Sequence, residues 1–215
     1  MPDWNAIAKR QEERSESAQG AVLRGNAAYG AGLARLMLGE VEAAREWFER
    51  AVAAYRESWA DAPPDSWGRP IAAMKSRLLV GEKAEAEALW ALDAGADSSE
   101  SPIGRYAAAL AHLVLGDDEP ARVHADALRT RDDFPREVGD ALATIAAGTD
   151  AVGYVEAVEA VLESFETRND YLEDVPVADT VLVLQALAEP RGLRTTLESP
   201  LLPPSRSPCA GGRPS

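Results

Sequence analysis

The 215-residue chain is acidic, with 36 Asp and Glu residues against 22 Lys and Arg residues and a formal net charge of −14. This charge repels nucleic-acid phosphates and anionic membrane surfaces, so no nucleic acid and no membrane is expected as a partner. No apolar run reaches the ~18 residues that span a bilayer, no signal peptide is recognisable, and the single cysteine, Cys209, cannot form an internal disulfide, so we predict a cytoplasmic protein.

The composition also bears on the source of the protein. The chain is rich in alanine and arginine and poor in lysine. A GC-rich genome explains this pattern, and so does a salt-rich cytoplasm in which carboxylates keep a protein hydrated. We favour a halophilic origin, which predicts that the melting temperature rises steeply with molar KCl.

The first 20 residues are polar and charged, with Trp4 and Ile7 as the main apolar anchors. They predict a mobile or loosely docked N-terminal helix. From Ala21 the apolar residues recur with helical spacing up to Leu38. Gly39 then supplies a tight turn, and a second helix follows to about Trp59.

This helix–glycine–helix pattern recurs along the chain. An aliphatic residue, Gly and a helix-starting residue stand in the same order at Gly39, Gly81, Gly116 and Gly148, which are separated by 42, 35 and 32 residues. Such spacing is typical of stacked helix pairs. We therefore expect an all-α domain over residues 21–190.

The first pair resembles the tetratricopeptide repeat. Gly32 lies seven residues before Gly39, and Ala44, Phe48 and Ala51 follow it at plus five, nine and twelve. Small residues at these positions let two helices approach closely, and the aromatic residue fills the gap. The later pairs match less well, and the resemblance extends over about residues 25–166. It implies a right-handed helical-hairpin solenoid of about four degenerate helix pairs.

The breaks between these pairs contain proline. A Pro-Pro loop between Trp59 and Trp67 separates the first two pairs, and the tryptophans more often pin such a loop to its own helices than contact a partner. The apolar segment 176–188 predicts a buried closing helix, although its valines leave a strand open. Residues 191–215 predict an extended apolar segment and a disordered tail.

The resemblance implies that the first helix of each pair lines a concave groove. The residues that the family places on this inner face are Tyr29, Leu33, Ile71, Lys75, Tyr106, Leu110, Val138 and Leu142. This lining is too apolar to stay open to water. Three covers are conceivable: an apolar partner segment, a second copy of the protein, or the chain itself, and we favour residues 176–203.

Candidate chemistry is sparse. A metal at His112 and His124 would need further ligands such as Asp117 or Asp126, and we expect ordinary histidines, no metal and no cofactor. No nucleophile elbow, phosphate-binding loop or dinucleotide fingerprint is present. If an acid–base site exists, we expect it where Glu173, Asp174 and Asp179 approach His112.

We accordingly predict a non-enzymatic intracellular adaptor or scaffold that binds a protein or peptide through its concave groove. A first alternative is a toxin-neutralising immunity protein. Its basic toxin would meet the stripe of carboxylates at Glu156, Glu159, Glu163 and Glu166. A second alternative is an enzyme with a carboxylate and histidine site in the concave face. The simplest interpretation of the stripe is a solvated helix face.

Overall fold

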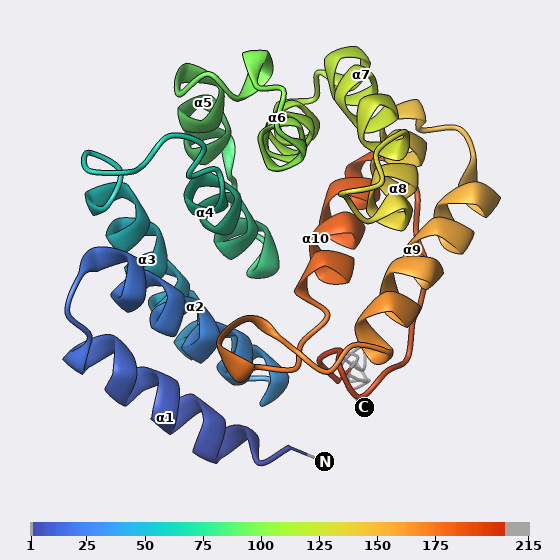
Figure 1. The fold of residues 1–215 in the computed structure, drawn as a ribbon. Helices are drawn as coiled ribbons and strands as arrows, with labels where there is room; N and C mark the ends of the chain where they lie inside the picture. The colour runs from blue at the N-terminus through green and yellow to red at the C-terminus, as the bar shows by residue number, and fades with distance from the viewer. Residues whose placement is uncertain (1, 205–215) are drawn as a thin grey trace, which may run out of the picture.

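The computed structural model describes residues 2–204, and within them it is all-helical, with ten α-helices and no β-strand (Figure 1). The α-helices are α1 (Trp4–Ser17), α2 (Ala21–Met37), α3 (Val41–Glu57), α4 (Gly68–Leu79), α5 (Glu85–Asp93), α6 (Pro102–Leu115), α7 (Asp118–Arg129), α8 (Arg136–Ala147), α9 (Ala151–Glu166) and α10 (Asp179–Ala188). No helix among these residues is both long and apolar enough to cross a bilayer. The predicted all-α class is confirmed.

Helices α2 to α9 follow one another as four hairpins. The turns of these hairpins contain Gly39, Gly81, Gly116 and Gly148, with φ of 77°, 72°, 82° and 66°. Glycine adopts this left-handed region without steric cost, so it ends one helix and lets the chain reverse. The four predicted turns are therefore present, and Figure 1 shows the hairpins following a curve around the molecule.

The first hairpin, α2 with α3, packs closely because of one glycine. A Cβ atom added to Gly32 would lie 2.7 Å from the ring of Phe48, so only glycine fits at this position. Tyr29 meets the edge of the same ring, with 5.5 Å between the ring centroids. The small residue and the aromatic residue thus occupy the roles predicted from their spacing.

The N-terminal helix α1 lies along α2. Its contact face is made of Ala8, Gln11 and Ser15, all of them buried. The side-chain amide of Gln11 donates a hydrogen bond of 2.6 Å to the backbone carbonyl of Glu173, near the opposite end of the chain. Arg35 of α2 pairs with Glu12 at 2.7 Å and adds a surface contact.

The Pro-Pro loop between α3 and α4 is held by tryptophans. The ring centroids of Trp59 and Trp67 lie 6.3 Å apart, and Trp59 meets the edge of Trp90 from α5 at 5.4 Å. Trp67 is buried and donates its indole N–H to Asp65 at 3.0 Å. Both loop tryptophans therefore contact the chain's own helices, as predicted.

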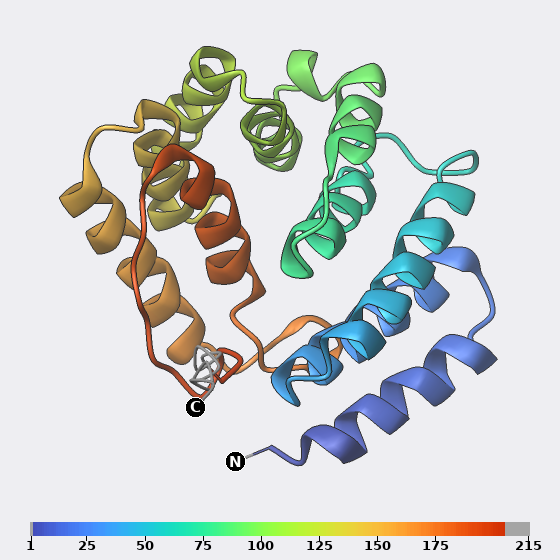
Figure 2. The same ribbon diagram turned by 180° about the vertical axis from the view of Figure 1, so that it is seen from behind.

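Helix α10 lies inside the curve of the hairpins, against α4, α8 and α9 (Figures 1 and 2). Val181, Val183 and Leu184 are fully buried there. Of the predicted segment 176–188, residues 179–188 are helical and residues 176–178 are not. Beyond it the chain runs back alongside α9, where the backbone N–H of Ala178 donates to the carbonyl of Leu201 at 2.9 Å. Of the segment 176–203 predicted to cover the concave side, α10 lies inside the curve, whereas the chain after it runs beside α9. The tail predicted at 205–215 lies outside the described residues.

Candidate functional site

The residues predicted to line the concave groove are buried beneath α10. Seven of them are between 0% and 8% exposed: Tyr29, Leu33, Ile71, Tyr106, Leu110, Val138 and Leu142. The eighth, Lys75, has a side chain that is 11% exposed. Leu33 and Lys75 also line a small hollow beside Asp179, whereas the other six pack into the hydrophobic core. Their role in partner binding stays a prediction, and in this structure the chain itself occupies their groove.

Polar members of this set meet Asp179, the first residue of α10. The Lys75 ammonium and the Tyr29 hydroxyl both lie 2.6 Å from Oδ2 of Asp179, and Lys75 also donates to the Thr180 hydroxyl at 3.1 Å. Burial by itself would raise the pKa of Asp179, but the charge and hydrogen bond of Lys75 more than offset it and hold that pKa below its ordinary value. The network therefore anchors the start of α10 to α2 and α4.

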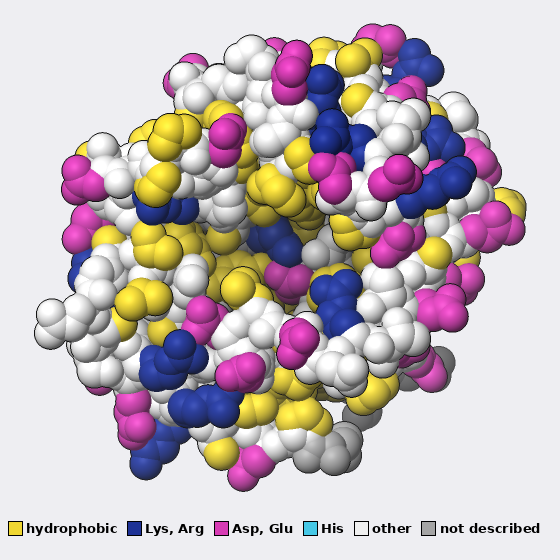
Figure 3. All heavy atoms as spheres, in the orientation of Figure 1, with side chains coloured by type: hydrophobic (Ala, Val, Ile, Leu, Met, Phe, Trp, Pro, Cys, Tyr) yellow, Lys and Arg dark blue, Asp and Glu magenta, His cyan; other side chains and the backbone are white. Residues whose placement is uncertain are grey.

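This anchored lysine is poorly suited to covalent chemistry. Burial would lower the pKa of Lys75, yet the neighbouring Asp179 carboxylate outweighs burial and raises it. A nucleophilic lysine needs the opposite shift, toward the neutral amine. A hollow of about 200 Å³ opens beside Lys75, Asp179 and Arg168, and Figure 3 shows basic and acidic side chains within an apolar surround at the centre of that face. The Lys75–Asp179 ion pair beside this hollow thus links α4 to α10.

The acid–base site predicted around His112 is wrong. Glu173 instead pairs with Arg14 at 2.8 Å, and Asp179 pairs with Lys75. His112 lies with Asp97 and His124. The prediction failed because it placed α10 near α6 without knowledge of how the helices pack.

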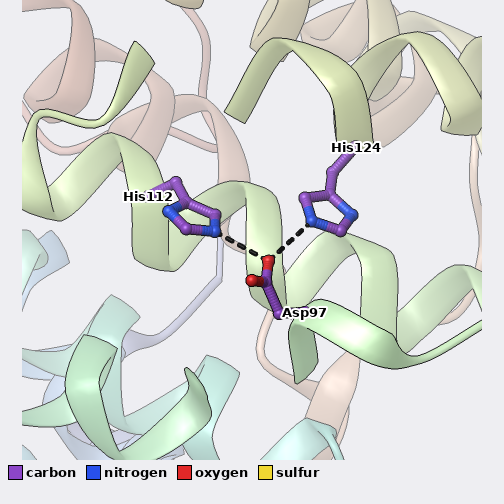
Figure 4. A group of neighbouring side chains, drawn as sticks. All are labelled: Asp97, His112 and His124. Atoms are coloured by element: carbon purple, nitrogen blue, oxygen red, sulfur yellow. Dashed lines mark hydrogen bonds and ion pairs between the residues drawn. The ribbon is translucent and has the colours of Figure 1, made fainter. Parts of the chain in front are cut away.

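The two histidines converge on one carboxylate that the sequence did not single out (Figure 4). The Nε2 atoms of His112 and His124 lie 2.8 and 2.9 Å from Oδ1 of Asp97. The two rings are nearly parallel, at 11°, with centroids 5.9 Å apart. Hydrogen bonds from His112 and then His124 lower the pKa of Asp97. Asp97 follows α5 in the short helical turn η1 (Ala96–Ser98), and no motif spacing links it to the histidines.

A larger hollow lies on the outer side of α7, α8 and α9. Its volume is about 770 Å³, and its lining includes four alanines of α8 and α9. Ala143 and Ala157 are buried, and Ala147 and Ala160 are exposed. Charged side chains form its rim, and Figure 3 shows basic and acidic groups interleaved over this part of the molecule. We call this the outer hollow. The hollow exists because alanine side chains leave the space between the helices unfilled.

The predicted carboxylate stripe follows α9 beside the outer hollow. Glu156, Glu159, Glu163 and Glu166 are all exposed, and none forms an ion pair with another described residue. The opposite face of α9 is buried through Val158, Leu162 and Phe165. Glu156 also lines the outer hollow, so the stripe and the hollow form one continuous surface.

Comparison with known proteins adds no relative. No protein-family model, no curated protein and no solved structure matches the chain. The function is therefore inferred from the surfaces and side chains described above.

Proposed function

We propose that this chain is a protein-interaction module of the helical-repeat type, intracellular and non-enzymatic, that binds a basic segment of another protein at the outer hollow and the α9 stripe. The observation that carries this proposal is the outer hollow itself, which has a volume of about 770 Å³, four alanines in its lining and a carboxylate-rich rim. A helix or an extended peptide can lay apolar side chains on these alanines while its charges meet the rim.

The charge balance of the hollow favours a cationic partner. Three arginines and five carboxylates line the hollow. Arg129 is bound by Asp140 at 2.5 Å, Arg122 by Glu119 at 3.0 Å, and Arg136 approaches Asp140 at 3.6 Å. Glu137 and Glu156, by contrast, form no ion pair with a described residue. The net charge of −14 extends the same attraction over a longer range, because complementary charge speeds diffusional encounter.

The expected tetratricopeptide-like solenoid is part of this proposal, with one change. In that family the concave groove is the usual interaction surface, whereas here α10 fills that side of the molecule. The proposal therefore moves the partner to the outside of the last two hairpins. The supporting features are the recurrent glycine turns and the close contact between Gly32 and Phe48.

A toxin-neutralising immunity protein is a second candidate. The specific observation in its favour is the unpaired stripe on α9. Like charges three or four residues apart destabilise a helix by about 0.2–0.5 kcal/mol per pair. A basic toxin domain would relieve this repulsion on binding and would gain affinity from the four carboxylates.

A charge-reversal experiment tests the surface. The variant Glu156→Lys/Glu163→Lys alters the stripe, and Glu13→Lys/Glu16→Lys on exposed α1 makes the same charge change elsewhere. All three proteins are used to capture partners from the native lysate at native salt. We expect a stoichiometric basic protein with the wild type and the α1 variant and its loss with the stripe variant. Retention of that partner by the stripe variant would contradict the proposal.

A further inference from the structure

The cluster of Asp97, His112 and His124 has no part in the proposed function. Within the described residues these three side chains, all of types that bind metals, lie close together. One oxygen or nitrogen from each lies within 4.8 Å of the others. Three different elements supply them, namely η1, α6 and α7. The histidine side chains are 8% and 9% exposed, whereas that of Asp97 is 58% exposed.

The ligand set matches one class of ion. Two imidazole nitrogens and one carboxylate oxygen suit zinc and similar transition metals, whereas Mg²⁺ and Ca²⁺ prefer oxygen ligands. Tetrahedral zinc with bonds near 2.0–2.1 Å places its ligand atoms about 3.3 Å apart. The present nitrogen–oxygen distances are 2.8 and 2.9 Å, and all three ligand atoms lie within 4.8 Å of one another, so binding requires the exposed Asp97 side chain to withdraw slightly and the two rings to adjust.

The His112 ring lies between two carboxylates. Its Nε2 faces Asp97 at 2.8 Å, and its Nδ1 faces the Asp117 carboxylate at 3.6 Å. In metal sites a histidine commonly donates its other N–H to a carboxylate. Asp117 is the carboxylate on that side of the His112 ring, at 3.6 Å and so beyond direct hydrogen-bond distance.

The second histidine leaves a polar atom without a partner. Nδ1 of His124 is buried and has no hydrogen-bond partner among the described residues, and Nδ1 of His112 has only the 3.6 Å approach of Asp117. Burial and the Nε2 contacts with Asp97 hold the two rings so that both Nε2 atoms are directed at one point.

We propose that Asp97, His112 and His124 bind a divalent transition-metal ion of the zinc class through both Nε2 atoms and one carboxylate oxygen. The exposed side of Asp97 leaves a further coordination position for water. Asp117 acts as the outer partner of His112. Bound metal links η1 to the α6–α7 hairpin and so stabilises the folded chain.

Metal binding by the tag-free full chain tests this site, since the chain contains only two histidines. We expect one Zn²⁺ per chain by calorimetry, and a melting temperature about 5–10 °C higher at a hundredfold excess of metal over Kd. Co²⁺ should give the visible absorption of a tetrahedral or five-coordinate ion. Asp97→Asn should weaken binding at least about tenfold. The matched control Asp93→Asn, an exposed carboxylate at the end of α5, should bind as the wild type does.

Two further measurements keep the test decisive if a histidine variant fails to fold. In the wild type, Zn²⁺ should shift the imidazole ¹⁵N resonances of both Nε2 atoms by NMR and leave both Nδ1 atoms protonated. Cys209→Ser should retain full binding, because the proposed site contains no thiolate. The proposal is overturned if the wild type binds no stoichiometric Zn²⁺, if Asp97→Asn binds unchanged, or if binding disappears with Cys209.

Discussion

Replacing Lys75 with methionine should destabilise the protein through the charge left on Asp179. Methionine keeps the apolar stem of the lysine but removes the ammonium that lies 2.6 Å from the carboxylate. Breaking one side of a buried ion pair costs about 3–5 kcal/mol. The carboxyl can escape only by taking up a proton, and holding it protonated at pH 7 against an ordinary pKa near 3.9 costs about 4 kcal/mol. The cost of breaking the ion pair and the cost of protonating Asp179 at pH 7 are thus of similar size.

Thermal and urea unfolding at several pH values provide the assay. At pH 7 we expect the melting temperature of Lys75→Met to fall by about 6–20 °C, which follows from a cost of about 3–5 kcal/mol and about 2–4 °C per kcal/mol for a chain of this size. The stabilising contribution of Asp179 in the wild type is present above pH ~4 and is lost as pH falls through its lowered pKa. In the variant that pKa is raised, so the difference between the two proteins should shrink toward pH 4.

A double variant serves as the control. Lys75→Met/Asp179→Asn removes the unpaired charge and should recover most of the stability lost by the single change. The reasoning is refuted if Lys75→Met costs less than about 1 kcal/mol at pH 7, below the range for a broken buried pair. It is also refuted if the cost is the same at pH 4 and pH 7, because lost packing rather than charge would then be responsible.

Three further predictions concern packing, alkaline stability and surface charge. Gly32→Ala should lower the free energy of unfolding in urea by about 1–3 kcal/mol, because the added Cβ would lie 2.7 Å from the Phe48 ring. The further change Phe48→Leu should recover part of that loss. No loss with Gly32→Ala would be inconsistent with the close approach of the two helices. Burial raises the pKa of Tyr154 to about 12, and burial and then Asp179 raise the pKa of Tyr29. The free energy of unfolding should therefore fall as pH rises above ~10, because only the unfolded state releases these protons there. An unfolding free energy that stays constant over this range in urea would contradict this prediction. Glu159→Lys should raise stability by about 0.8–2 kcal/mol at low salt, because two repulsive pairs in the stripe become attractive, and the gain should fade as salt is added.

The sequence was most informative where structure depends on neighbours along the chain. The glycine turns follow from local backbone geometry, and the contact of Gly32 with Phe48 follows from helical spacing within one hairpin. The closing helix was recognisable because an apolar segment of that length must be buried. Its covering of the concave side followed from the need to shield an apolar groove.

Contacts between distant segments could not be predicted in the same way. Asp179 was expected beside His112, but it lies beside Lys75 and Tyr29, which are far away in sequence and belong to other hairpins. Asp97 escaped notice because it stands in a turn with no motif spacing to either histidine. Only the packing of η1, α6 and α7 brings these three side chains together.

Amide hydrogen exchange of α10 tests most directly the central claim, that the chain itself closes its concave side. If α10 is an integral part of the core, its amides should exchange only through global unfolding, at the rate of the amides in α4 and α8 on which it packs. Exchange of α10 about a hundredfold faster than that of α8, which corresponds to an opening free energy lower by about 2.7 kcal/mol, would contradict the claim. The concave groove would then be accessible to a partner.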